Sequence, residues 1–288
     1  MSFEVWRAMK LDNQCFATVR RYLRRLTYTP STDMVGTSDS LQVYWWDKRK
    51  NLGDVLNKQL LELIGGSQVC WVPNNYSYEH FLATGSILGR ANEHSVIWGS
   101  GLISKNDLPI FTPKKIHAVR GPLTRAVLLT KGIDCPQVYG DPALLLPMYF
   151  KSSSAKRYAI GVIPHYVDKQ PWITNIENDD ILFIDIETDD VQGFIDSVLS
   201  CDIILSSSLH GIIIADAYGI PAYHVNFGGK LIGGNFKFDD YYQSVHRKPV
   251  NVIPLGREKD LLSASRLSRD VDFSFDATPL LQACPFLE

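Results

Sequence analysis

Cysteine is scarce in this sequence. Its five cysteines are widely scattered and form no CxxC pair, and no two histidines stand at the spacing of zinc ligands. This distribution argues against a disulfide framework and against a structural zinc site, and it suits a reducing compartment. We therefore expect a cytoplasmic protein without a metal site of this kind.

Long apolar runs and an excess of charge are missing as well. No run approaches the ~20 apolar residues that cross a bilayer, and the first residues lack the apolar core of a signal peptide. The formal net charge is −2 at pH 7, which gives no electrostatic reason to expect a nucleic-acid partner. With 288 residues, of which 45% are hydrophobic and 21% charged, the chain is of ordinary globular composition and long enough for two domains.

Residues 1–36 are basic and differ from the rest of the chain. Residues 1–30 carry six lysines and arginines against two acidic residues, with apolar side chains such as Phe16, Val19 and Leu23 interleaved. Two interpretations are open: a basic amphipathic helix that rests on an anionic membrane surface, or a solvated helix packed on the body of the protein. In both, this segment is an extension in front of the domains.

The most informative stretch is Cys201–Pro221. An apolar strand over 203–205 is followed by three serines and by a helix that we predict from about 209 to 218. The serines are Ser206, Ser207 and Ser208. His210 would then lie in the first helical turn, beside free backbone N–H groups and the positive end of the helix dipole. The turn is a candidate anion site with His210 as its functional group. The alternative is that His210 is an ordinary polar residue on a first helical turn.

Two turns in the first half of the chain are further candidate binding sites. A strand over 41–46 leads into Asn51-Leu52-Gly53-Asp54, where Asn51 and Asp54 are candidate helix caps. A strand over 95–98 ends in Gly99-Ser100-Gly101, whose two glycines would let the backbone approach a ligand closely. Both patterns also occur in ordinary turns.

Candidate charged and polar ligands follow three other strands. Arg120 follows a strand over 116–119, and its guanidinium suits phosphate or carboxylate recognition, with a surface ion pair as the alternative. His165 follows a strand over 158–163. Lys237 comes after a strand over 222–225 and a glycine-rich loop, in a polar and aromatic cluster that either binds a sugar or docks the loop.

Strands and helices alternate in both halves of the sequence. This alternation predicts an α/β protein with two Rossmann-like domains that face one another across a cleft. A polar break at 151–156 separates an N-terminal domain, 37–152, from a C-terminal domain, 153–288, that carries the serine and histidine turn. Because ligands of open α/β sheets bind at the carboxyl ends of the strands, we expect Arg120 and His210 to meet in the cleft.

The motifs, taken in order, resemble the polysaccharide pyruvyl transferase family. They are Asn51-Leu52-Gly53-Asp54, Trp98-Gly99-Ser100-Gly101, Val119-Arg120-Gly121-Pro122, Tyr139-Gly140-Asp141-Pro142-Ala143, Ile163-Pro164-His165-Tyr166 and Ser206-Ser207-Ser208-Leu209-His210-Gly211. Each motif is weak alone, whereas the ordered set spans most of the chain.

The resemblance implies a GT-B-like fold and a transferase activity. The enolpyruvyl group of phosphoenolpyruvate would be moved onto a sugar of an exopolysaccharide or of a lipid-linked oligosaccharide repeat, with formation of a pyruvate ketal and release of phosphate. Phosphoenolpyruvate is then the donor substrate, and no cofactor is expected. A lipid-linked saccharide acceptor would place the enzyme at the inner face of the plasma membrane.

The roles of individual residues follow from that resemblance. We expect His210 to act as general acid/base, Arg120 to neutralise a carboxylate or phosphate, and the serine turn to donate hydrogen bonds. Asn51, Asp54 and His165 would line the acceptor side. Many relatives carry an arginine two residues before the histidine, where this chain has Ser208. The role of that cation would pass to Arg120, Lys237 or Arg247, or to backbone N–H groups.

Two other functions share these sequence features. A GT-B glycosyltransferase that uses a nucleotide sugar has the same fold, and fold alone does not separate the two activities. A non-catalytic carbohydrate-binding component of polysaccharide assembly fits the loss of the arginine at position 208. Binding of phosphoenolpyruvate and release of phosphate would distinguish the pyruvyl transferase from both.

Overall fold

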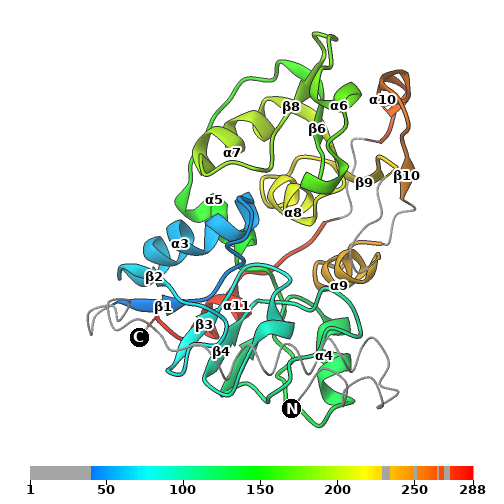
Figure 1. The fold of residues 1–288 in the computed structure, drawn as a ribbon. Coiled ribbons are helices and arrows are strands. Elements are labelled where there is room, and N and C mark those ends of the chain that lie inside the picture. The colour runs from blue at the N-terminus through cyan, green and yellow to red at the C-terminus, as the bar shows by residue number, and fades with distance from the viewer. Residues whose placement is uncertain (1–39, 229–233, 249–251, 265, 269–272, 288) are drawn as a thin grey trace, which may run out of the picture.

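The computed structural model describes residues 40–228, 234–248, 252–264, 266–268 and 273–287. The basic segment 1–36 lies outside these residues, so both interpretations of it stay open. The described chain forms two five-stranded parallel sheets (Figure 1). This arrangement confirms the predicted α/β class and is consistent with two Rossmann-like domains. No helix in the described ranges is long and apolar enough to cross a membrane.

The first sheet has the strand order β2-β1-β3-β4-β5, and all its adjacent strands are parallel. Its strands are β1 (Leu41–Val43), β2 (Val69–Trp71), β3 (His80–Leu82), β4 (Ser95–Trp98) and β5 (Lys115–Ala118). The helical elements beside it are α3 (Leu52–Gly65), the 3-10 turn η2 (Leu88–Arg90) and α4 (Pro122–Leu129). We call these elements the first half.

Local residues determine where helix α3 begins and ends and which of its faces is buried. The Asn51 side chain accepts a hydrogen bond from the Gly53 N–H and caps the amino end, while Gly66, with φ of 65°, ends the helix in the left-handed conformation. Apolar residues recur at helical spacing along one side, where Leu52, Leu56 and Leu60 are fully buried. The cap therefore fixes where the Asn51–Asp54 turn begins, and the buried face holds it against the body of the protein.

The second sheet has the strand order β10-β9-β8-β6-β7, again all parallel. Its strands are β6 (Tyr158–Ile163), β7 (Ile181–Phe183), β8 (Cys201–Ser206), β9 (Ala222–Asn226) and β10 (Ile253–Pro254). The helical elements of this part of the chain are η4 (Tyr166–Asp168), α6 (Pro171–Thr174), α7 (Val191–Leu199), α8 (Leu209–Ala217), α9 (Phe236–Ser244) and α10 (Glu258–Ala264), of which α9 packs on α4 of the first half. We call these elements the second half.

One hydrophobic cluster contains residues of both halves. The 3-10 turn η3 (Pro142–Leu145) and the short helix α5 (Leu146–Tyr149) end the first half and pack on α8. Helix α8 is apolar all round, and Ile212, Ile213 and Ile214 are fully buried because it lies between its own sheet and the first half. The Leu52 N–H also donates to the Ile186 carbonyl of the second half at 2.8 Å. These contacts fix the amino ends of α3 and α8 next to one another.

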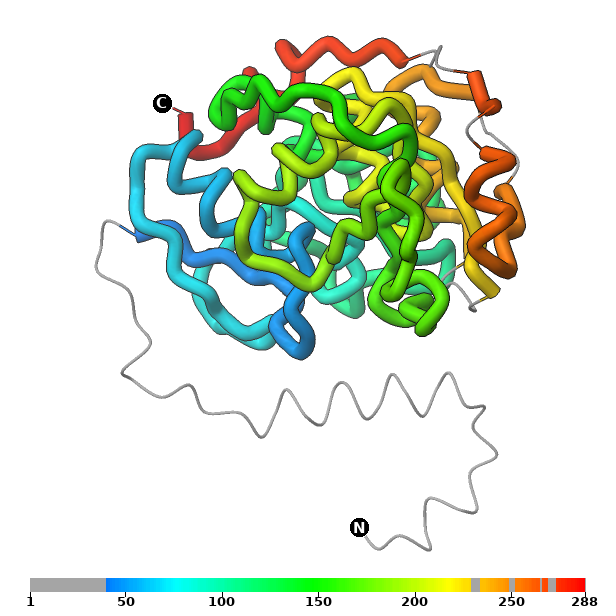
Figure 2. Tube along the Cα trace, turned by 90° about the horizontal axis from the view of Figure 1, so that it is seen from above, coloured from blue at the N-terminus to red at the C-terminus, as the bar shows by residue number. Residues whose placement is uncertain are grey.

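The C-terminal segment returns to the first half. Helix α11 (Thr278–Gln282) lies among the first sheet's elements, and Figure 2 shows the red end of the chain beside the blue and cyan part. The indole N–H of Trp98 donates to the Leu280 carbonyl at 2.9 Å, and the Phe286 ring packs edge-on against Trp98. The segment therefore ties the two halves together, and the predicted boundary near residue 152 stays a prediction.

Candidate functional site

A cavity of about 410 Å³ lies between the two halves. From the first half it is lined by Trp46, Asn51, Asp54, Gly85, Ser86, Ile87, Arg90, Ile103 and Asp107, and from the second by His165, Tyr166, Ser208, Leu209, His210 and Lys237. Most of these residues follow the carboxyl ends of strands, where parallel α/β sheets bind their ligands. The structure thus brings six of the predicted site residues, Asn51, Asp54, His165, Ser208, His210 and Lys237, to one cavity.

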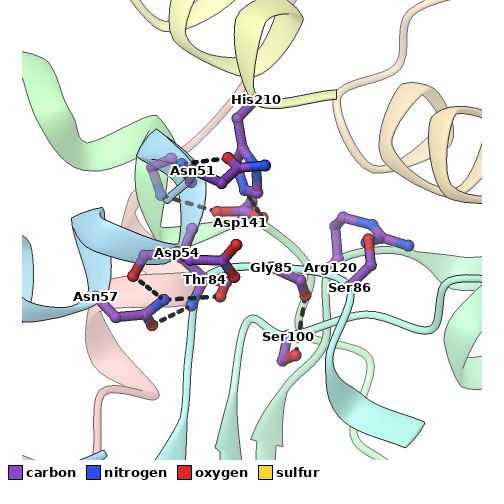
Figure 3. Close-up of polar contacts among 12 residues, drawn as sticks. Asn51, Asp54, Asn57, Thr84, Gly85, Ser86, Ser100, Arg120, Asp141 and His210 are labelled. Atoms are coloured by element: carbon purple, nitrogen blue, oxygen red, sulfur yellow. Dashed lines mark hydrogen bonds and ion pairs between the residues drawn. The ribbon is translucent and has the colours of Figure 1, made fainter. Parts of the chain in front are cut away.

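His210 projects from the first turn of α8 toward the first half (Figure 3). Its side chain is 11% exposed, and its Nε2 atom lies 3.7 Å from Oδ2 of the fully buried Asp141. Both atoms are buried and lack a hydrogen-bond partner in the described part of the chain. The other Asp141 oxygen accepts from the Ala143 N–H and caps η3. Asp141 is therefore held by its cap while its free oxygen faces the imidazole.

Gly53 is required by the position of the imidazole. A Cβ atom added at residue 53 would overlap the His210 ring, with Nδ1 as the nearest atom. Gly53 itself does not line the cavity; its N–H is held by the Asn51 side chain. The Asn51-Leu52-Gly53-Asp54 turn therefore provides a surface on which the His210 ring rests, and this surface depends on the missing side chain.

Asp54 follows directly, in the first turn of α3. Burial raises the pKa of its carboxyl from the ordinary 3.8 to about 7, and the charge of His210 and a backbone hydrogen bond from Trp46 oppose this rise only in part. The carboxyl faces the turn at Gly85, where a Cβ atom would lie 3.8 Å from Asp54 Oδ1. Asp54 is therefore a carboxyl group that is partly protonated near neutral pH, and it borders the cavity beside His210.

The three serines of the turn after β8 have different surroundings. Ser206 Oγ donates toward the Ile163 and Ser208 carbonyls and accepts from the Ser208 N–H, so it holds the turn itself. Ser207 Oγ accepts from the His165 N–H at 2.9 Å and so connects two strand ends. Ser208 occupies the N-cap position of α8 without a side-chain capping bond, and it lines the cavity. Of the three, Ser208 is the one placed to meet a ligand.

The Gly99-Ser100-Gly101 turn supports the cavity from behind. Ser100 Oγ and the Gly101 N–H both donate to the Gly85 carbonyl at 3.0 Å, and none of the three residues lines the cavity. Gly101 packs against the Arg120 guanidinium, which a Cβ atom at 101 would overlap. The Gly99-Ser100-Gly101 turn thus holds the Gly85–Ser86 turn in place, and it is the Gly85–Ser86 turn that lines the cavity (Figure 3).

Arg120 is fully buried and does not reach the cavity surface. Its guanidinium pairs with Asp240 of α9, donates to the Leu102 carbonyl at 2.7 Å, and donates to Ser86 Oγ at 2.7 Å. Asp240 also accepts from the Thr124 N–H and hydroxyl at the start of α4. The predicted contact of Arg120 with a ligand anion stays a prediction, and its position connects it to the cavity through Ser86.

Lys237 lies at the cavity in the first turn of α9, 6% exposed. The pKa of its ammonium group is lowered from 10.5 to about 8, mainly by burial and also by the charge of Arg120, while Asp168 opposes the shift. No ion pair or hydrogen bond of its ammonium group occurs among the described residues. Arg247, the other candidate cation, is buried in a pair with Asp216 at 2.7 Å. Lys237 is thus a cation available to an anionic ligand.

His165 borders the same cavity from the end of β6. The pKa of its imidazole is lowered to about 4, mainly by burial and also by the charges of Lys237, Arg49 and His210, while Glu187 opposes the shift. It is therefore neutral at pH 7. Its Nδ1 atom accepts from the Val167 N–H and caps η4, and its ring packs on Tyr166 at 4.1 Å between ring centroids. A neutral imidazole here suits hydrogen bonding to a hydroxyl group.

Sequence reasoning missed two parts of the site. Asp141 was recognised within a motif but not as the partner of His210, because the two residues lie on different elements. The other part is the Gly85–Ser86 turn, which the sequence patterns did not single out. It comes soon after strand β3, and Gly85 has φ of 120°. No group of three or more metal-ligating side chains is placed to hold an ion in the residues that the structure describes.

Two parallel sheets whose carboxyl edges border one cavity are the arrangement in which α/β proteins bind their ligands. The chain belongs to the polysaccharide pyruvyl transferase family: the sequence model of that family matches residues 15–228. Membership supports a role as a pyruvyl transferase and implies a polysaccharide acceptor.

The chain is also similar to two known sequences and to one solved structure. An uncharacterized protein of Acanthamoeba polyphaga mimivirus is 38% identical over 210 residues, which cover 70% of this chain and 73% of that protein. The succinoglycan biosynthesis protein ExoV of Rhizobium meliloti (strain 1021) is 27% identical over 239 residues, 77% of this chain and 71% of that protein. Among solved structures, an uncharacterized protein of Klebsiella pneumoniae covers 81% of this chain and 94% of its own, with 11% identity and a TM-score of 0.42.

Proposed function

We propose that the protein transfers the enolpyruvyl group of phosphoenolpyruvate onto a saccharide, forms a pyruvate ketal and releases inorganic phosphate. In this proposal the two halves act as the two domains of a GT-B-like enzyme, with donor and acceptor meeting in the cavity between them. The proposal rests on two features of one cavity. His210 is backed by Asp141, and Lys237 is a cation that has no ion pair among the residues the structure describes.

The donor would bind on the side of the second half. Phosphoenolpyruvate brings a phosphate and a carboxylate, so its site needs cations and N–H donors. Lys237 supplies the cation in place of the arginine that Ser208 replaces, since Arg120 and Arg247 are already in buried ion pairs. The amino end of α8 and the Ser208 hydroxyl supply further donors beside His210. Arg120 acts on the site by holding Ser86.

The acceptor would enter from the side of the first half. Asn51, Asp54 and the neutral imidazole of His165 border that side and offer hydrogen bonds to sugar hydroxyls. His210 serves as general acid/base for the attacking hydroxyl, a contribution worth roughly 10²- to 10⁴-fold in rate. Asp141 keeps the imidazole in place. The chemistry uses no cofactor beyond the donor itself.

The basic segment 1–36 would hold the enzyme at an anionic surface on the cytoplasmic side of the plasma membrane, where a lipid-linked acceptor is available. The test is co-sedimentation of the full chain with anionic and with neutral vesicles. Replacing Arg20, Arg21, Arg24 and Arg25 by Glu should abolish binding to the anionic vesicles. Unchanged binding would remove this part of the proposal.

The decisive experiment titrates phosphoenolpyruvate into the wild-type protein and into the His210→Ala and Lys237→Ala variants, and assays phosphate release with candidate saccharides. Saturable binding that Lys237→Ala weakens, with phosphate release that His210→Ala abolishes, is the expected result. Thermal protection by a nucleotide sugar but not by phosphoenolpyruvate would indicate a glycosyltransferase instead. Saccharide binding without phosphate release would indicate a non-catalytic protein.

A further inference from the structure

Formation of a pyruvate ketal needs two groups that start in opposite protonation states. The methylene carbon of the enolpyruvyl group must gain a proton, while the attacking hydroxyl must lose one. A neutral imidazole can accept the hydroxyl proton at one nitrogen, but the N–H on its other nitrogen is too weak an acid to protonate carbon in the same step. If the proposed function holds, the cavity must therefore contain a second group that starts protonated.

Asp54 is placed to be that group. Figure 3 shows its carboxyl on the side of α3 that faces the Gly85–Ser86 turn, below the His210 side chain. His210 rests on Gly53, the residue directly before Asp54 in the first turn of the helix. Both side chains line the same cavity, one from each half. A substrate carbon between them would be reached from two sides.

We infer that Asp54 is the catalytic residue that protonates the methylene carbon, while His210, positioned by Asp141, takes the proton of the attacking hydroxyl.

The steps balance with these two residues alone. In the first step Asp54 gives its proton to the methylene carbon as the C=C π bond breaks, the acceptor oxygen bonds to the adjacent carbon, and the hydroxyl proton passes to His210. In the second step the bond from that carbon to the phosphate oxygen breaks with its electron pair, and the phosphate takes the proton from His210. A second hydroxyl then bonds to the carbon and its proton returns to Asp54. Both residues end in their starting states.

The electrostatics of the cavity agree with this division. Burial raises the pKa of the Asp54 carboxyl to about 7, so a large share of it carries a proton at neutral pH. The other charged or titratable side chains that line the cavity are Arg90, Asp107, His165, Tyr166, His210 and Lys237, and Asp141 lies behind His210. The bound phosphate would neutralise the positive charge of Lys237. The negative charge of the trianionic donor would in addition favour the protonated form of Asp54.

The test compares the wild type with Asp54→Asn, which keeps shape and volume but has no acidic proton. We expect kcat for phosphate release to fall roughly 10²- to 10⁴-fold while the dissociation constant for phosphoenolpyruvate changes little. Glu79→Gln, which removes an exposed carboxylate paired with Lys114, serves as the control and should keep full activity. Thermal unfolding of both variants checks their folding.

A measurement on the wild type keeps the assignment falsifiable if the variant folds poorly. At saturating phosphoenolpyruvate, kcat should fall as pH rises through an apparent value at or above about 7, because Asp54 then loses its proton. A flat kcat between pH 6 and 10, or an Asp54→Asn variant with more than a tenth of wild-type kcat, overturns the assignment but leaves the proposed function. A wild type that neither binds phosphoenolpyruvate nor releases phosphate overturns both.

Discussion

The imidazole of His210 occupies the space that a side chain at Gly53 would need. The two residues come from different halves of the molecule, in the first turns of α8 and α3. The absence of a single Cβ atom therefore lets the two helix ends approach one another, and it defines where the imidazole lies relative to the cavity.

The first prediction concerns Gly53→Ala. In a helix, alanine is ordinarily more stable than glycine by about 0.5–1 kcal/mol, but here its methyl group would displace His210. We expect kcat to fall roughly 10²-fold, as it does when a catalytic group moves by about 1 Å, with little change in thermal stability. Gly256→Ala is the matched control, because its nearest neighbour lies 3.9 Å from the added methyl group. Normal kinetics of Gly53→Ala would show that the position of His210 does not matter.

Lys237 leads to a prediction about pH. Its pKa is lowered to about 8, so the ammonium group loses its proton as pH rises through that value, and with it the attraction for an anionic donor. We expect the dissociation constant for phosphoenolpyruvate, measured by calorimetry from pH 6 to 9.5, to be constant below about 7 and to increase above about 8. The Lys237→Gln variant should bind weakly at all these pH values, while a change at exposed Lys131 should leave the profile intact. A wild-type profile that matches that of Lys237→Gln would contradict the role of this cation.

The pair Arg120–Asp240 gives a prediction about stability. Both side chains are fully buried, and Asp240→Ala would leave the guanidinium without its carboxylate. Such a change is expected to lower the free energy of unfolding by about 3–5 kcal/mol, measured by urea denaturation. The exposed pair Arg257–Asp260 is the control, and Asp260→Ala should have little effect. A small effect of Asp240→Ala would mean that Arg120 is free to take another partner, such as a ligand anion.

The sequence predicts the elements of this fold better than the partners of its charged residues. The helix expected from about 209 to 218 is observed as Leu209–Ala217, and the strand expected over 158–163 is observed as Tyr158–Ile163. Caps, glycine stops and apolar spacing are local signals, so they are visible in sequence. Strand β2 has three residues, too few for an apolar pattern to show.

The sequence does not show which distant residues form pairs in the fold. Arg120 stands at a strand end like a ligand-binding residue, but Asp240, 120 positions away, occupies its guanidinium. Large separations in sequence likewise hide the pairing of His210 with Asp141 and the overlap of His210 with Gly53. Residue types therefore indicate that a site exists, whereas the packing of the two halves decides which cation, Lys237 and not Arg120, lines the cavity.

Asp141 supports a prediction that separates positioning from binding. Asp141→Asn keeps the oxygen that caps η3 but removes the negative charge that faces His210 Nε2 at 3.7 Å. We expect kcat to fall roughly 10²-fold while KM for phosphoenolpyruvate stays near the wild-type value, since the lysine and the helix end are untouched. A rise in KM with unchanged kcat would assign Asp141 to binding instead. The measurement is steady-state phosphate release over a range of donor concentrations.

The last prediction follows from the cost of an ionised carboxylate at Asp54. Its pKa is about 7 in the folded protein against 3.8 ordinarily, so between these values the folded state holds a proton that the unfolded state has lost. The wild type should therefore lose stability relative to Asp54→Asn as pH rises from about 4 to about 7, by at most about 4 kcal/mol. Urea denaturation at pH 4, 6 and 8 measures the difference, which should be small at pH 4 and favour the variant at pH 8. A wild type that gains stability relative to the variant over this range would show that Asp54 is ionised and paired, and would remove it as a proton donor.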